Sequence, residues 1–289
     1  MKKKWFAAAL AGTLLAVLLL NGCASAQTAK RLRFGVAGEG GVYHAFGELY
    51  AALENETDNG TVELKTTAGS AANLRLLTGE YLQLAIAQGD LAQDAYDQTG
   101  IFADEEETRG FGAVAALYTE ACQIVVRADA DIQSVEDLQG KTVSIGAEES
   151  GSEQNALQIL AAYGLNDKLV DTVNLNYEDA AAQLKAGKVD AIFITAGAPS
   201  PVLTELAGEC GIRLLNVDGA AAQRLTSAYS AYSAVTLPAG TYPGQDTDVQ
   251  TVGVKAVLLA SDELPAKQVQ KLTELLFSGR EGMEEQLGI

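Results

Sequence analysis

Residues 32–53 read "LRFGVAGEGGVYHAFGELYAAL": a short apolar run, a glycine-rich loop and an amphipathic segment. The first part predicts a strand, and apolar residues at positions 42, 46, 49, 50 and 53 follow helical spacing and predict a helix over 42–56. Glycines at 38, 40 and 41 precede that helix and leave backbone N–H groups open to an approaching group. Since the first N–H groups of a helix attract negative charge, this unit predicts a strand followed by an anion site.

The same order of elements recurs along the chain. Strands are expected at 61–67, 82–88, 141–147, 171–177 and 189–195, and helices at 68–80, 153–165 and 178–188. Two stretches, "NLRLLTGEYLQLAIAQ" and "AAQLKAGKVDAIFIT", share a helix, a glycine stop and an apolar strand. This similarity indicates two related α/β units, so the expected fold class is α/β with probable parallel strands and two lobes.

The chain is expected to cross twice between the two lobes. The first passage lies near "GAVAALYTEACQIVVRA", and the extended, turn-rich residues 229–261 bring the chain back before a last helix at 264–279. The predicted lobe one is therefore 31–118 plus 230–289, and lobe two is 119–229. Two crossings form a hinge, and the cleft between the lobes is the natural place for a ligand.

The first 22 residues combine a basic start with an apolar run, which predicts a secretory signal. The small residue before Cys23 resembles a bacterial lipobox, so we expect cleavage before Cys23 and lipidation of its thiol, with residues 23–30 as a tether. An ordinary signal peptide or a membrane helix is the alternative. Cleavage removes three lysines and changes the formal charge from −18 to −21. The expected location is extracytoplasmic, with a lipid anchor on the outer face of a bacterial cytoplasmic membrane.

Composition and spacing argue against several function classes. The acidic charge disfavours nucleic-acid binding. Metal-binding Cys/His spacing, a dinucleotide fingerprint, a phosphate-binding P-loop and a G-x-S-x-G elbow are all missing from the sequence. We therefore expect no metal, no cofactor, no catalytic residue and no enzyme activity, although an Asp/Glu pair remains an open alternative. Cys122 and Cys210 are expected either to pair or to stay as free thiols.

Polar and glycine-rich loops follow the predicted strands. They read "GEGGVY", "AGSAAN" and "QGD" in one lobe, and "SGSE" and "TAGA" in the other. In open α/β sheets, ligands bind beyond the carboxyl ends of the strands. Small side chains, hydroxyls, amides and bare N–H groups together suit a carboxylate or a phosphate.

These loops, in this order, resemble the TAXI family, the extracytoplasmic solute receptors of tripartite ATP-independent periplasmic (TRAP) transporters. The resemblance covers about residues 32–277 and rests on "GEGGVYHAFGELYAAL", "TTAGSAANLRLLTGEYLQLAIAQGDLAQDAY", "AALYTEACQIVVRADADIQSVEDLQGKTVSIGAEESGSE", "DAIFITAGAPSP" and "LPAGTYPGQDTDVQTVGVKAVLLAS". It implies a two-lobed periplasmic binding protein fold of type II. It also implies capture of a small organic anion, glutamate-like or 2-oxoglutarate-like, for a membrane permease driven by an ion gradient.

The resemblance implies a set of ligand contacts in this sequence. Tyr43 would stack on the ligand, Ser70, Ser152 and helix N–H groups would take a carboxylate, and an α-ammonium group could pair with Glu120 or Asp90. The full set is Gly41, Val42, Tyr43, Ser70, Asn73, Gln88, Tyr118, Glu120, Gly151, Ser152, Thr195, Ala196 and Gly197.

Four residues depart from the family pattern: Glu39, His44, Glu148 and Glu149. Extra carboxylates near an anion site disfavour a highly charged ligand unless they face solvent. The chain ends at "EGMEEQLGI", and a final segment that packs on lobe one in the family is expected to be missing.

The function expected from sequence is that of a monomeric solute-binding lipoprotein. Its partners are a small carboxylate or amino-acid ligand, the TRAP permease subunits and the membrane, the last through the lipid anchor only. The alternative is a sensor protein of the same fold that binds its ligand for a signalling partner.

Overall fold

A single mixed sheet organises the part of the chain that the computed structural model describes, residues 31–57 and 62–288. The strand order is β2-β1-β3-β10-β4-β7-β5-β6, with β8 paired to β4 and β9 paired to β10. The strands are β1 (Leu32–Gly35), β2 (Val62–Lys65), β3 (Leu84–Gln88), β4 (Phe111–Arg127), β5 (Thr142–Ser144), β6 (Asp171–Val173), β7 (Ala191–Ala196), β8 (Ile212–Leu215), β9 (Ser233–Leu237) and β10 (Val249–Ser261).

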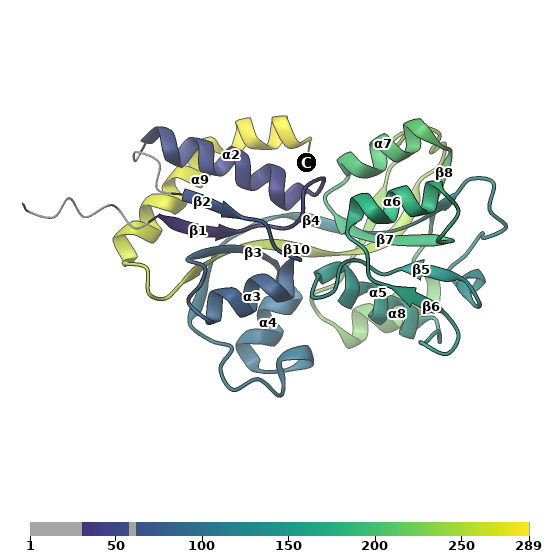
Figure 1. Cartoon of the computed structure of the whole chain (residues 1–289), viewed down its shortest axis with the longest axis horizontal. Coiled ribbons are helices and arrows are strands. Elements are labelled where there is room, and N and C mark those ends of the chain that lie inside the picture. The colour runs from purple at the N-terminus through teal and green to yellow at the C-terminus, as the bar shows by residue number, and fades with distance from the viewer. Residues whose placement is uncertain (1–30, 58–61, 289) are drawn as a thin grey trace, which may run out of the picture. The chain divides into compact units, whose positions relative to one another are not determined.

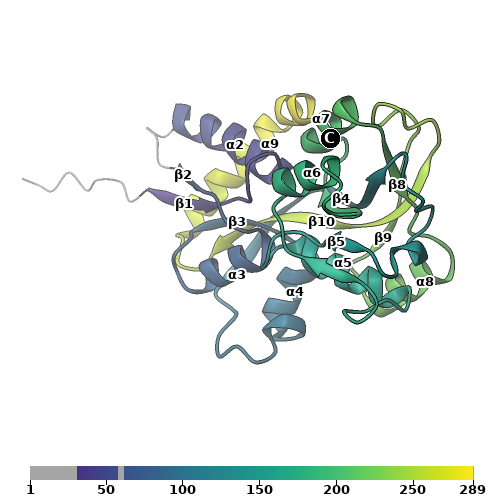
Figure 2. The same ribbon diagram turned by 45° about the vertical axis from the view of Figure 1, so that its right-hand side comes forward.

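Parallel strands form both ends of the sheet, and two long antiparallel strands join them. β1 pairs in parallel with β2 and β3, and β5 pairs in parallel with β6 and β7. Between them, β10 runs antiparallel to β3 and β4, and β4 runs antiparallel to β7. Figure 2 shows β4 and β10 passing from one end of the sheet to the other. Both crossings of the chain are therefore made by long strands.

Helices cover both faces of the sheet at each end (Figure 1). We call β1–β3 with α2, α3, α4 and α9 the first lobe, and β5–β8 with α5, α6, α7 and α8 the second lobe. The helices are α2 (Val42–Thr57), α3 (Ser70–Thr78), α4 (Gly89–Asp97), α5 (Gly151–Ala162), α6 (Tyr177–Lys185), α7 (Pro201–Glu209), α8 (Gly219–Ala228) and α9 (Ala266–Leu287), with short 3₁₀ turns η1 (Gly100–Phe102) and η2 (Glu136–Leu138).

Each face of each lobe has its own apolar core. In the first lobe, Phe34 of β1 and Tyr50 of α2 belong to the core on the side of α2 and α9. Leu74 and Phe102 belong to the core on the opposite face of the sheet. In the second lobe, two further clusters lie on the two faces of β4 and β7, with Ile124 in one and Val125 in the other. The alternation of side chains along a strand explains why neighbours in β4 enter different cores.

The sequence predicted most of these elements, with some differences. The strand expected at 171–177 ends at Val173, and Tyr177 begins α6, which Asn176 caps by accepting a hydrogen bond from the Asp179 N–H. Helices α4, α7 and α8 were not predicted, and the last helix continues to Leu287.

Part of the segment that the sequence assigned to lobe one packs with the second lobe. Tyr232, Val252 and Val254 belong to the core that contains Phe193, and Tyr242 belongs to the other second-lobe core. The chain thus returns to the first lobe within β10. The lobe boundaries inferred from sequence stay a prediction, since residues 32–289 group as one compact unit.

The N-terminal predictions lie outside the described residues. These are the signal peptide at 1–22, lipidation of Cys23 and the tether at 23–30. In the part that is described, no helix is both long and apolar enough to cross a membrane. Cys122 and Cys210 are free thiols, and the first of them is buried.

Candidate functional site

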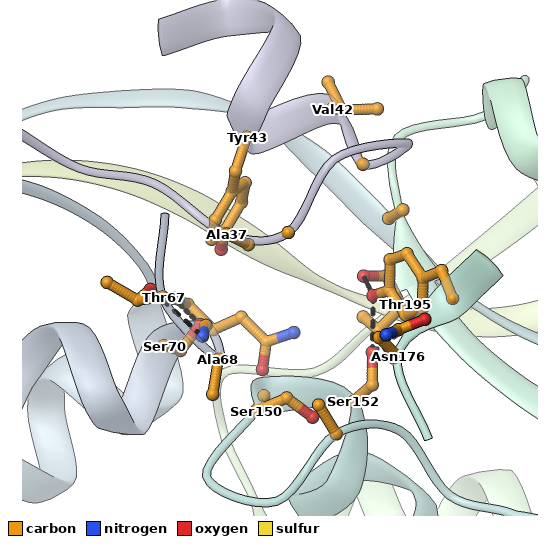
Figure 3. A pocket seen from close by; sticks show the side chains of 18 of the residues that line it. Ala37, Val42, Tyr43, Thr67, Ala68, Ser70, Ser150, Ser152, Asn176 and Thr195 are labelled. Carbon is orange, nitrogen blue, oxygen red and sulfur yellow. Dashed lines mark hydrogen bonds between the residues drawn. The ribbon is translucent and has the colours of Figure 1, made fainter. Parts of the chain in front are cut away.

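A cavity of about 260 Å³ lies where loops of the two lobes meet. Figure 3 shows labelled side chains from several loops turned toward this space, with Tyr43 coming from α2, Ser70 from α3 and Ser152 from α5. The residues that line it are Ala37, Gly38, Glu39, Gly41, Val42, Tyr43, Thr66, Thr67, Ala68, Gly69, Ser70, Gln88, Glu120, Ala147, Ser150, Gly151, Ser152, Asn176, Tyr177, Thr195 and Ala196.

Four helices begin at this cavity. Their first residues are Val42, Ser70, Gly151 and Tyr177, and all four line it. The first N–H groups of a helix have no partner within the helix, and they carry the positive end of its dipole. The strands that precede these helices end at the same place, as expected at the carboxyl edge of parallel strands. The site therefore attracts negative charge without a positively charged side chain.

The loop after β1 brings the backbone of the first lobe close to the second lobe. Gly40 has a left-handed φ of 78°, which a glycine adopts without strain. A Cβ atom at Gly41 would lie 3.7 Å from the Tyr177 ring of the second lobe. Val42, the next residue, is buried in a core of the second lobe. The glycines thus let the start of α2 reach across the site.

The start of α3 depends on the second lobe. Its cap residue, Gly69, has no side chain to accept a hydrogen bond. Instead, the carbonyl of Glu149 accepts from the N–H groups of Ala71 and Ala72, at 3.1 and 3.2 Å. These two donors are therefore satisfied only while the lobes are together.

An ion pair reinforces this contact between the lobes. The Arg75 guanidinium on α3 binds the Glu149 carboxylate at 2.8 Å and the Glu105 carboxylate at 2.9 Å. Glu149 has a φ of 64°, in the left-handed region that is strained for residues other than glycine. Its side chain and its carbonyl both bind the first lobe, so the described structure is held in a closed arrangement.

Two hydroxyl groups in the second lobe form a satisfied network. The Ser152 hydroxyl accepts from the Thr195 N–H at 3.0 Å and lies 2.6 Å from the Tyr177 hydroxyl. The Tyr177 hydroxyl donates to the Thr195 carbonyl at 2.8 Å, so the proton between the two hydroxyls comes from Ser152. In this arrangement the Ser152 hydroxyl holds Tyr177 and the end of β7, and its predicted contact with a carboxylate stays a prediction.

A carboxyl group is buried in the wall on the side of the first lobe. Glu120 of β4 is 2% exposed, and its Oε2 accepts a hydrogen bond from the Tyr43 hydroxyl at 2.7 Å. The pKa of Glu120 is raised to about 8, mainly by burial and to a smaller extent by the nearby Asp90, while the hydrogen bond from Tyr43 acts in the opposite direction. Burial and the nearby Glu120 also raise the pKa of Tyr43, so this hydroxyl remains a donor.

Residues 34–287 match the NMT1-like family. The chain belongs to the NMT1-like family. Its fold is also similar to solved structures of binding proteins. PhnD1 from Prochlorococcus marinus in complex with methylphosphonate has a TM-score of 0.61 at 13% identity, over 90% of this chain and 89% of that one. The GluR0 ligand-binding core with L-glutamate has a TM-score of 0.54 at 14% identity, over 90% and 99%.

The alkanesulfonate-binding protein SsuA from Xanthomonas axonopodis pv. citri, bound to MOPS, has a TM-score of 0.53 at 18% identity, over 89% of this chain and 78% of that one. These similarities confirm the predicted fold class, a two-lobed periplasmic binding protein fold.

Most of the residues predicted as ligand contacts come together in this NMT1-like protein. The ten that line the cavity are Gly41, Val42, Tyr43, Ser70, Gln88, Glu120, Gly151, Ser152, Thr195 and Ala196. Their contact with a ligand stays a prediction.

Three predicted contacts, Asn73, Tyr118 and Gly197, are not in the lining. Asn73 is completely buried, and its amide nitrogen donates to the carbonyls of Gly35, Val36 and Ile86. Its carbonyl oxygen accepts from the Thr67 hydroxyl at 2.7 Å. Asn73 thus joins the ends of the first-lobe strands. Tyr118 borders a separate apolar cavity under α9.

Sequence reasoning missed Asn176 and Tyr177. Both line the cavity, but they were assigned to the end of a strand. The signal was available, because an asparagine followed three residues later by an aspartate is a typical start of a helix. The same rule that pointed to the other loops, the carboxyl end of a parallel strand, also applies here.

The four departures from the expected pattern have different positions. Glu39 lies exposed at the edge of the cavity, and Glu148 is exposed outside the lining. Glu149 binds Arg75, and His44 lies 3.6 Å from Glu48 on α2. The extra carboxylates at 148 and 149 are thus not in the cavity wall. Among the described residues, no group of His, Cys, Asp or Glu side chains is placed to hold a metal ion.

Removing the Arg75–Glu149 ion pair is expected to have a small effect on binding. Both side chains are about one third or more exposed, and exposed pairs contribute about 0–1 kcal/mol. We expect Arg75→Gln to weaken ligand binding by about two- to fivefold, mainly through faster dissociation. Arg33→Gln is the matched control, since the contacts of the Arg33 guanidinium, with Gln83, the Glu80 carbonyl and the Tyr81 ring, all lie within the first lobe. Surface plasmon resonance measures both rates, and equal rates for the two variants would contradict this role.

Proposed function

We propose that this NMT1-like protein is an extracytoplasmic receptor that captures a small organic anion. The observation that carries the proposal is the cavity formed by the starts of four helices from two lobes. Among the described residues that line it there is no lysine, arginine or histidine, so a carboxylate would be held by N–H groups and hydroxyls. Its volume is below the range of about 300–1,000 Å³ of pockets for drug-sized ligands, which suits a molecule of amino-acid size.

The finer proposal is a TAXI-type lipoprotein that binds a glutamate-like or 2-oxoglutarate-like acid. It would be anchored to the outer face of the cytoplasmic membrane through Cys23 and would deliver its ligand to a TRAP permease. The loop sequences support this permease class. The solved structures include the substrate-binding protein of an amino acid ABC transporter, so the alternative is delivery to an ATP-driven permease. Uptake into vesicles driven by an ion gradient without ATP would support the first, and strict dependence on ATP would overturn it.

A thermal-shift screen of the purified protein tests the receptor proposal. We expect an amino acid, dicarboxylate or keto acid to raise the melting temperature, because a ligand at 100 times its Kd adds about 2.7 kcal/mol to the free energy of unfolding. The ligand should be recovered unchanged after incubation. Conversion of the ligand to a product would favour an enzyme, and no shift with any acid would contradict an anion receptor.

A further inference from the structure

The charged side chains among the described residues of the cavity wall are all acidic. Among the described lining residues, the charged side chains are Glu39, which is exposed at the edge, and Glu120, which is buried. No lysine or arginine among the described lining residues supplies a positive charge. A buried carboxyl group without a cationic partner is costly to ionise, so the partner of Glu120 has to come from elsewhere.

The cavity wall that contains Glu120 also contains a buried oxygen atom that accepts no hydrogen bond from the described residues. Tyr43 donates to Oε2 of Glu120. Gln88 is 2% exposed, lines the same cavity, and has an Oε1 without a hydrogen-bond partner among the described residues. The wall thus holds a buried carboxyl group and a buried, unpartnered amide oxygen, both of which can accept hydrogen bonds from an ammonium group.

We propose that Glu120 binds the ammonium group of a 2-amino carboxylate, and that it thereby selects amino acids over the matching 2-oxo acids. This inference rests on the proposed function, and it names which of the two acid classes the receptor takes. The carboxylate of the ligand lies at the helix starts and its ammonium group lies against Glu120. A 2-oxo acid brings no positive charge, so it offers the protonated Glu120 carboxyl only a neutral hydrogen bond, which is weaker than the ion pair with an ammonium group.

Binding of an ammonium group also moves a proton. In the free protein Glu120 is protonated at pH 7, because its pKa is about 8, and the positive charge of the ligand favours the ionised form. The groups that face it are Tyr43 from α2, Tyr118 and Cys122 from β4, Asp90 from α4 and Tyr177 from α6. The phenols and the thiol have raised pKa values and stay neutral, and burial raises the pKa of Asp90 to about 6, so it is ionised at pH 7. Amino-acid binding therefore releases a proton near pH 7 and releases none above about pH 9.

Isothermal titration calorimetry with L-glutamate, 2-oxoglutarate and glutarate tests the inference, because the first two compounds differ only at C2. We expect L-glutamate to bind wild type at least tenfold more tightly than 2-oxoglutarate, with release of nearly one proton at pH 7 when buffers of different ionisation enthalpy are compared. Glu120→Gln is expected to lower the affinity for L-glutamate by about 10–100-fold, to leave that for 2-oxoglutarate within about threefold, and to abolish proton release.

Controls separate this inference from the proposed function. Tyr43→Phe keeps the Glu120 carboxyl, so it retains the preference for the amino acid and the proton release even if both affinities fall. Equal or tighter binding of 2-oxoglutarate by wild type would overturn the charge selection and leave the receptor proposal intact. An equal loss of affinity for both ligands in Glu120→Gln would also overturn the charge selection and leave the receptor proposal intact, provided that the melting temperature of the variant matches that of wild type. Binding of none of the three acids would overturn the glutamate-like ligand class, and the selection with it.

Discussion

Replacing Gly151 with valine is expected to weaken ligand binding by about 100-fold while the protein still folds. Gly151 is the first residue of α5 and lines the cavity, and a Cβ atom there would lie 2.3 Å from the Gln88 side chain of the first lobe. Gln88 is itself buried, so it has little room to move. Overpacking of this kind costs about 1–3 kcal/mol, and the upper end corresponds to about 100-fold in affinity.

Gly208→Ala is the matched control for this experiment. Gly208 lies in α7, and a Cβ atom there would have no neighbour within 4 Å. Titration calorimetry of both variants with the acid identified by the thermal-shift screen should show normal binding for Gly208→Ala only. Adding Gln88→Ala to Gly151→Val should restore part of the lost affinity, because it removes the side chain that the valine meets. Wild-type affinity in Gly151→Val would show that the lobes do not need to meet at this point.

Replacing Asn73 with alanine is expected to lower the free energy of unfolding by about 3 kcal/mol. The substitution removes the donor for the carbonyl groups of Gly35 and Val36 at the end of β1 and of Ile86 in the middle of β3, and the acceptor for the Thr67 hydroxyl. Each buried polar group left without a partner costs about 1–3 kcal/mol, and relaxation of the loops recovers part of the sum. Urea unfolding followed by circular dichroism measures the change.

Asn166→Ala serves as the control, because Asn166 accepts from the Lys168 N–H within one exposed turn and should cost less than 1 kcal/mol. The experiment also separates two roles for Asn73. A structural role predicts a loss of stability with little change in Kd for the fraction that remains folded. A direct ligand contact, as inferred from sequence, predicts the opposite pattern.

Local patterns predicted the first lobe well because its elements carry strong signals. The helix over 42–57 has apolar residues at helical spacing, and the strand at 84–88 is buried along its whole length. Helices α7 and α8 are short, with 9 and 10 residues, and their sequences did not predict them. Tyr177 was placed at the end of the strand expected at 171–177, yet the asparagine cap before it begins a helix.

The candidate site followed from one rule, that loops at the carboxyl ends of parallel strands face one another. The rule correctly brought Ser70 and Gly151 to one cavity although they lie in different lobes. It could not tell which polar side chains turn toward the cavity and which turn toward the backbone. Asn73 is one turn after Ser70, and only the packing of α3 against β1 and β3 shows that its amide binds their carbonyls. The contact of Glu149 with α3 could not be predicted from the sequence either, because it depends on how two distant segments meet.

The position of β10 in the sheet sets the order in which the chain can fold during synthesis. This strand lies between β3 and β4, but its residues, 249–261, come near the end of the sequence. A nascent chain therefore carries nearly all of its apolar surface before β10, the second of the two strands that join the ends of the sheet, exists. At about 5–20 residues per second, the ribosome needs roughly 2–8 s for the last 40 residues, and the first lobe stays incomplete for that time. The export that we propose is compatible with this delay, because a chain that has not yet closed its sheet remains available to chaperones and to a translocation channel.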